Sequence, residues 1–154
     1  MRFVILVLVL ILAGCSVTAN HPTSDKFVST SDTMEIIRKA AASAPEGVKG
    51  DYVLSIKAVG KQGPVVYLNT ELDYRDQRNV TVALHPNVVR QLEAQHGVTA
   101  EEFFIGKQIR VNGDAQRVRV DFINAQRKPS DKYYFQTHIR ISNSTQIEVV
   151  NESA

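Results

Sequence analysis

The chain has 154 residues, of which 44% are hydrophobic and 22% are charged, and this ordinary globular composition predicts one small domain. Its formal net charge of +2 is too small to indicate a polyanion partner by itself. The presence of a single cysteine excludes an internal disulfide.

The N-terminus has the pattern of a secretion signal. Arg2 supplies a positive charge, residues 4–12 carry no polar side chain, and the small residues Ala13 and Gly14 precede Cys15. A transmembrane helix needs roughly 20 apolar residues, and the run from 4 to 12 is far shorter. We therefore expect residues 1–14 to be a cleaved signal peptide.

The run Leu12-Ala13-Gly14-Cys15 resembles the lipobox of bacterial lipoprotein precursors. The resemblance implies cleavage before Cys15 and attachment of fatty acids such as palmitate to this cysteine, which would anchor the chain permanently in a membrane. The residue after the cysteine is Ser16 and not an aspartate. In lipoproteins of this kind, that difference implies that the protein is anchored in the outer membrane and faces the periplasm. The polar composition of residues 15–32 predicts a flexible linker behind the anchor.

A short helix is expected within residues 33–49, capped by Asp32 or Thr33, with a packing face formed by Met34, Ile37 and Ala41. From residue 50 onward the hydrophobic period changes from helical to alternating, which is typical of strands. The residues from 50 to 150 are therefore expected to form the folded domain, with 151–154 as a tail.

Strands are expected at 52–59, 65–70, 79–85, 108–122 with a break around Gly113, and 133–142, followed by an apolar segment at 146–150. A helix is expected between the third and fourth strands, beginning at Pro86 and ending at Gly97. Its apolar positions recur at helical spacing and are Val88, Val89 and Leu92.

This order, together with two sequence runs, resembles stand-alone bacterial OB-fold domains. The runs are Gly106 to Gly113 and Gln146 to Val150, which look like the fourth strand and the closing segment of such domains. Val66 to Asn69, a loop containing Asp73-Tyr74, and Val80 to Val82 resemble the second and third strands. The resemblance implies a mainly β, five-stranded Greek-key barrel with one helix between strands three and four.

The sequence contains no phosphate loop, no H-E-x-x-H, no cysteine pair and no G-x-S-x-G. We therefore expect no catalytic residue, no metal and no cofactor. Glu71, Asp73 and Asp76 lie close together, but Arg75 and Arg78 are interleaved with them, which predicts a salt-bridged surface loop. The alternative is an envelope-polymer hydrolase that uses this loop at 71–76 with His85.

Two surfaces are candidate binding sites. The preferred one lies where OB-folds bind ligands and consists of Tyr67, Asn69, Tyr74, Arg75 and Arg78. The alternative is an outer row on the last two strands, consisting of Arg117, Arg119, Tyr134, His138 and Arg140. Alternation places Val118, Val120 and Phe122 inside and these arginines outside, and the outer rows of the two strands adjoin if the strands pair as the OB-fold resemblance implies. The histidine of this row is expected to gain charge below about pH 6.5.

The function that fits these observations is a non-catalytic binding or interaction module tethered in the envelope. Its expected partners are the membrane, through the lipid, and an envelope protein, a glycan or a small anionic ligand. An oligonucleotide-binding domain is the alternative, but nucleic acid is not the expected partner, because the charge is near neutral and the envelope normally lacks nucleic acid.

Overall fold

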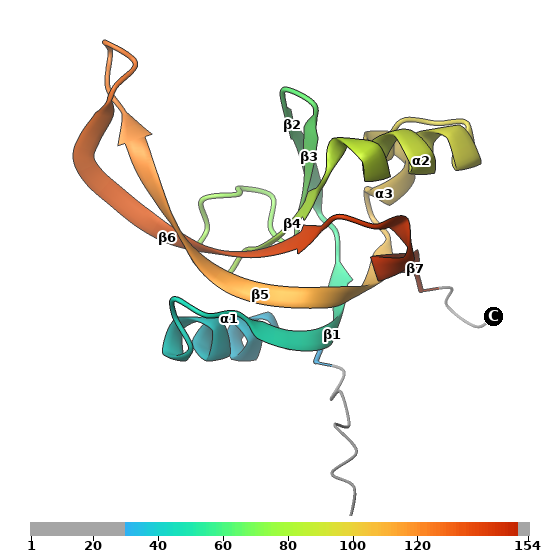
Figure 1. Ribbon diagram of the computed structural model, residues 1–154, viewed down its shortest axis with the longest axis horizontal. Coiled ribbons are helices and arrows are strands. Elements are labelled where there is room, and N and C mark those ends of the chain that lie inside the picture. Colours follow the sequence, from blue (N-terminus) through green and yellow to red (C-terminus); the bar gives the residue numbers. More distant parts are fainter. Residues whose placement is uncertain (1–29, 151–154) are drawn as a thin grey trace, which may run out of the picture.

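The computed structural model describes residues 30–150, so the signal peptide, Cys15, nearly all of the predicted linker and the tail at 151–154 lie outside the described residues. Figure 1 shows a strongly curved sheet with helices at its ends. The elements in chain order are α1 (Thr33–Ala42), β1 (Val48–Ser55), β2 (Ala58–Gln62), β3 (Val65–Asn69), β4 (Val80–Leu84), α2 (Pro86–His96), α3 (Ala100–Phe104), β5 (Gln108–Ile123), β6 (Pro129–Ile141), η1 (Ser144–Gln146) and β7 (Ile147–Val149).

The seven strands form one mainly antiparallel sheet with the order β1-β5-β6-β4-β3-β2, and β7 pairs with β5. Only β4 and β6 pair in parallel. The strands at the two ends of this order, β1 and β2, follow each other in the chain with only Ile56 and Lys57 between them. The sheet is open, because its two edge strands, β1 and β2, do not pair with each other. It curls, however, so that these two edge strands are consecutive in the chain.

The expectation of five strands is wrong in number, and the mainly β class is confirmed. The predicted strand at 52–59 is divided between β1 and β2, which pair with different strands. The predicted break around Gly113 does not occur, since β5 runs without interruption from Gln108 to Ile123. Glycine is needed at 113 because an added Cβ would lie 2.9 Å from Cγ2 of Ile139. Two helices, α2 and α3, occupy the predicted one-helix connection.

The core is one apolar cluster contributed by β1, β3, β4, β5, β6 and all three α-helices. Helix α2 begins at Pro86 and ends at Gly97, whose φ of 71° is the left-handed conformation that glycine tolerates, as predicted. Its predicted apolar face is confirmed, because Val88, Val89 and Leu92 are buried.

Helix α1 packs on β5, β1, β4 and β6 and completes the core (Figure 1). Asp32 is its N-cap, and Asp32 Oδ1 accepts a hydrogen bond of 2.9 Å from the amide of Met34. The predicted packing face is wrong for two of its three residues: Ile37 packs against the core, but Met34 is 52% exposed, Ala41 is exposed, and the buried side chains are Ile36 and Ala40. The buried pair Ile36 and Ala40, spaced four residues apart, therefore lies one position before the predicted pair Ile37 and Ala41.

The two sequence runs that carry the OB-fold resemblance pair with each other. Ile109 and Val111 of β5 lie opposite Val149 and Ile147 of β7. The Gln146 side chain joins the runs further, because its Nε2 donates to the carbonyl of Asn112 at 3.0 Å. Within residues 30–150, no helix is long and apolar enough to cross a membrane.

Candidate ligand-binding face

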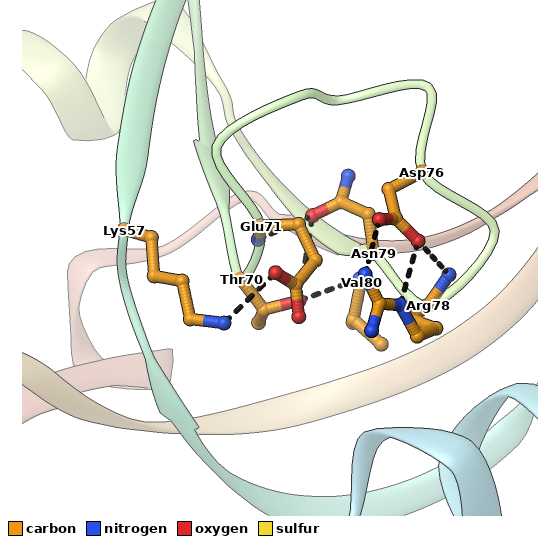
Figure 2. A network of polar contacts seen from close by, with 7 residues as sticks. All are labelled: Lys57, Thr70, Glu71, Asp76, Arg78, Asn79 and Val80. Carbon is orange, nitrogen blue, oxygen red and sulfur yellow. Dashed lines mark hydrogen bonds and ion pairs between the residues drawn. The ribbon is translucent and has the colours of Figure 1, made fainter.

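The loop between β3 and β4 is held by the buried side chain of Asn79. Its Nδ2 donates to Oδ1 of Asn69 at 3.0 Å and to Oγ1 of Thr81 at 2.9 Å. It also lies 3.2 Å from the carbonyl of Tyr74. Its Oδ1 accepts from Oγ1 of Thr70 and from the amide of Glu71 (Figure 2). Because one amide joins both ends of the loop and its middle, the position of Tyr74 depends on Asn79.

The three carboxylates of this loop are each paired with a cation. Glu71 Oε2 lies 2.8 Å from Nζ of Lys57, and the Asp76–Arg78 pair has an N–O distance of 2.7 Å (Figure 2). Asp73 pairs with Arg75 at 3.1 Å. The pKa of the Asp76 carboxyl is lowered to about 2, chiefly by the Arg78 side chain. The predicted salt-bridged loop is confirmed.

A cavity of about 460 Å³ lies between the β2–β3 hairpin and the β5–β6 arm, which rise from the same side of the sheet (Figure 1). Asn69 of β3 and Thr81 of β4 contribute to its lining from the sheet between them. Four ring side chains line it as well, and these are Tyr67, Tyr74, Tyr134 and His138; the amides of Gln62 and Gln136 also contribute. Lys61 is the one charged residue among the described residues that line this cavity. The cavity is therefore suited to a planar ligand that stacks on rings and forms hydrogen bonds.

Gln136 ties the arm to the loop across this cavity. Its Nε2 donates to the carbonyl of Tyr74 at 2.7 Å, which turns its Oε1 toward Nε2 of His138, also at 2.7 Å. His138 therefore donates from Nε2, and the proton of the neutral imidazole lies on that atom. The wall of the cavity is thus pre-organised by a chain of three residues.

His138 is uncharged at neutral pH. Burial is the main cause that lowers its pKa from 6.5 to about 4, and the nearby Arg140 guanidinium lowers it further. The expectation that this histidine gains charge below about pH 6.5 is therefore wrong, because a strand exterior was assumed to be solvated. Burial also raises the pKa of Tyr134, so its phenol remains a hydrogen-bond donor.

A second cavity, of about 400 Å³, continues the first along the same face. The two share Tyr67 and His138, whose ring centroids are 6.4 Å apart in an edge-to-face arrangement. The second cavity extends past Ala83 and Val118 to Arg140, whose Nη1 donates to Oε1 of Gln116. The two cavities adjoin at the rings of Tyr67 and His138 and are together called the groove.

The structure brings together three of the five preferred site residues. Tyr67, Asn69 and Tyr74 line the first cavity, whereas Arg75 and Arg78 do not. Both guanidinium groups are exposed and paired with Asp73 and Asp76. Sequence reasoning missed Gln136, Thr81, Val120 and the hairpin residues Gly60, Lys61 and Gln62. Val120 was expected to point inward, but it lines the open cavity, since the arm extends beyond the core.

The alternative row does not form one surface. Residues directly opposite each other in an antiparallel pair share a face, and Arg119 pairs with Phe135, whereas Tyr134 pairs with Val120. Arg117 and Arg119 therefore lie on the face of Tyr133 and Phe135. Tyr134, His138 and Arg140 lie on the opposite face, which forms the groove. The alternation of β6 was predicted correctly, but its register against β5 was assumed and is shifted by one residue.

The residues proposed for a hydrolase are not brought together. The acidic loop precedes β4 and His85 follows it, so five residues of extended strand, roughly 17 Å, separate them. Moreover, Nδ1 of His85 accepts from the amide of Asn87 as the N-cap of α2. Among residues 30–150, no group of three or more His, Cys, Asp or Glu side chains could hold a metal ion.

Comparison with known proteins gives structural similarity only. No family model matches the chain, and no curated protein matches it. One similar solved structure is a putative aspartyl-tRNA synthetase from Leishmania major Friedlin, with 15% identity and a TM-score of 0.43 over 92% of this chain. Another is an aspartyl-tRNA synthetase from Entamoeba histolytica, with 12% identity and a TM-score of 0.46 over 99% of this chain. The chain spans 24% and 29% of the length of these two proteins.

One expectation needs correction on the chemistry of the groove. Nucleic acid was set aside as a partner because the net charge is near zero and because of the inferred compartment. Net charge is the wrong measure for this groove, since rings and amides line its first cavity and Lys61 is the one charged residue in that lining. Nucleic acid is therefore a candidate ligand.

Proposed function

We propose that the chain is an OB-type binding module that holds a short single-stranded nucleic acid in the groove on its outer face. The observation that carries the proposal is the pair of adjoining cavities, which share Tyr67 and His138 and present ring side chains in series. Stacking of a base on an aromatic side chain is worth about 1–3 kcal/mol and tolerates any base.

The amides and hydroxyls of the groove supply the polar part of such a site. Asn69 Nδ2 has a second N–H beyond its contact with the Tyr67 carbonyl, Gln136 Oε1 has a second lone pair, and neutral His138 has an acceptor at Nδ1, so these three groups can pair with a base edge. Phosphates would lie toward Lys61 at the hairpin and Arg140 in the second cavity. A duplex keeps its bases stacked inside, so this arrangement suits single strands.

Fluorescence anisotropy with a short labelled oligonucleotide tests this proposal, and two adjacent tyrosines provide a matched pair of variants. Tyr134 lines the cavity, whereas Tyr133 lies on the opposite face of the same strand. Tyr134→Ala is expected to lower affinity by roughly 10-fold, as loss of one stacked base implies. Tyr133→Ala should leave it unchanged.

Three results would overturn the proposal. These are absence of oligonucleotide binding, equal loss in both tyrosine variants, and equal affinity for a duplex of the same sequence. Retention of a polysaccharide that depends on Tyr134, in place of the oligonucleotide, would assign the groove to a different class of ligand.

We also propose that the chain is anchored in the outer membrane, facing the periplasm, through fatty acids on Cys15. Support comes from the lipobox-like run and the polar residues that follow it. Labelling of cells with a fatty-acid probe should mark the wild-type protein and not Cys15→Ser, which should accumulate as uncleaved precursor. Incorporation of label into the variant would contradict the anchor. This test and the oligonucleotide test succeed or fail independently.

A further inference from the structure

The β5–β6 arm, defined as residues 116–136, projects beyond the rest of the sheet (Figure 1). β1 pairs with β5 only as far as Ala115, and β4 pairs with β6 only from Thr137 onward. The arm is therefore a two-stranded ribbon, with one face turned to the groove and the other turned away from it.

The arm concentrates positive charge. Between residues 117 and 132 there are five basic and two acidic side chains, a formal charge of +3, whereas the whole chain carries +2. The basic residues are Arg117, Arg119, Arg127, Lys128 and Lys132. The near-neutral total thus conceals a local cationic surface.

The face turned away from the groove carries exposed rings with a guanidinium beside each, and Arg119 on this face pairs with Asp121 at 2.8 Å. The positive charge is least compensated at the tip, where Arg127 and Lys128 are the charged residues between 122 and 130. The guanidinium carbon of Arg117 lies 3.7 Å from the ring centroid of Phe135, and that of Arg119 lies 4.2 Å from that of Tyr133. Both rings are close to half exposed, and Ile123 near the tip is 62% exposed. A cationic surface with exposed apolar side chains at the end of a projecting ribbon is unusual for a surface that meets only water.

We propose that the tip of the arm docks on an anionic phospholipid bilayer, with Ile123 and the neighbouring rings in the interface and Arg127 and Lys128 on the headgroups. Aromatic rings are stable at that depth, and each Lys or Arg near an anionic surface contributes to attraction. Nucleic acid suits this surface less well, because the guanidinium groups already cover the rings on which bases would stack. The aliphatic side chain of Ile123 has neither a ring nor a hydrogen-bonding group with which to bind a base.

Tryptophan fluorescence tests the docking directly, since the chain contains no native tryptophan. In the full chain reconstituted with vesicles, Ile123→Trp is the reporter, and Val98→Trp, 41% exposed beyond α2, is the control. With phosphatidylcholine–phosphatidylglycerol vesicles, emission from the indole of the reporter should shift to shorter wavelength and be quenched by brominated acyl chains. Emission from the control should not change.

Adding Arg127→Gln and Lys128→Gln to the reporter should shift the docking equilibrium toward release by about 30-fold and abolish the quenching. The proposal is overturned by an unquenched reporter, by equal quenching of the control, or by quenching that is the same without phosphatidylglycerol. An equal spectral shift of the reporter when an oligonucleotide is added without vesicles would assign the tip to nucleic acid. None of these outcomes bears on the anchor, which the labelling of Cys15 tests separately.

Discussion

Nε2 of His138 lies 2.7 Å from Oε1 of Gln136, and this contact orients the imidazole in the wall of the groove. Burial, reinforced by Arg140, lowers the pKa of His138 to about 4. In the unfolded chain the same group takes up a proton near pH 6.5. Between these two values the unfolded state binds more protons than the folded state, so stability must fall as the pH is lowered.

We expect His138 to cost the protein up to about 3 kcal/mol of unfolding free energy between pH 6.5 and pH 4. Urea unfolding of the wild type and of His138→Gln at a series of pH values measures this contribution. The variant should lose much less stability than the wild type over the same range. Parallel pH profiles of the two proteins would show that the imidazole titrates normally.

Asn79→Ala should lower the unfolding free energy by roughly 2–4 kcal/mol, because it leaves buried partners such as Asn69 without a hydrogen bond. It should also weaken oligonucleotide binding, since Tyr74 loses one of the contacts that place it. Arg78→Ala is the control on the same loop, and its exposed ion pair with Asp76 should contribute little to stability. Chemical denaturation measures both, and equal losses would contradict the role of Asn79.

A chain beginning at residue 30 should fold with full stability. A chain beginning at residue 50, the domain boundary expected from the sequence, should be strongly destabilised. The shorter chain lacks α1 and with it the buried side chains Ile36 and Ala40. Ile36→Ala alone should cost about 2–5 kcal/mol. Thermal unfolding by circular dichroism checks this, and equal melting temperatures for the two chains would contradict it.

Val120 was expected to point into the core, and Val120→Asp was therefore expected to unfold the protein. Since Val120 lines the open cavity, this change should reduce stability little. Ile139→Asp should unfold the protein, because Ile139 is fully buried and an unpaired charge there costs several kcal/mol. Urea unfolding of the two variants distinguishes the positions, and loss of folding in Val120→Asp would restore the original register.

The sequence predicted the mainly β class and α2 with its first residue Pro86 and its C-cap Gly97, since these depend on local chemistry that a pattern reveals. It also named six residues of the groove, three on each candidate surface, which are Tyr67, Asn69, Tyr74, Tyr134, His138 and Arg140. Pro86 and Gly97 favour the start and the end of a helix regardless of what the helix packs against. The register between β5 and β6 could not be predicted, because both faces of the arm carry rings and cations and alternation alone does not fix which rows adjoin. The lowered pKa of His138 was missed because its surroundings depend on tertiary packing, such as the Tyr67 ring of β3, whose centroid lies 6.4 Å from that of the imidazole.

The last prediction concerns which charges attract the ligand. Arg75 and Arg78 are each paired with a carboxylate two residues earlier, so each pair presents little net charge to a phosphate. Replacing both pairs together (Asp73→Asn, Arg75→Gln, Asp76→Asn and Arg78→Gln) should therefore leave oligonucleotide affinity and its salt dependence unchanged. Lys61 lines the cavity, and Lys61→Gln should reduce the slope of log affinity against log salt by about 0.7.

Anisotropy titrations at several salt concentrations measure both slopes. Neutral replacement of whole pairs is the better design, because removing the arginines alone would expose Asp73 and Asp76 and repel the ligand regardless of any contact. If the four-residue variant loses the salt dependence and Lys61→Gln keeps it, the phosphates lie over the β3–β4 loop, and the path of the ligand runs toward Tyr74 and not along the hairpin.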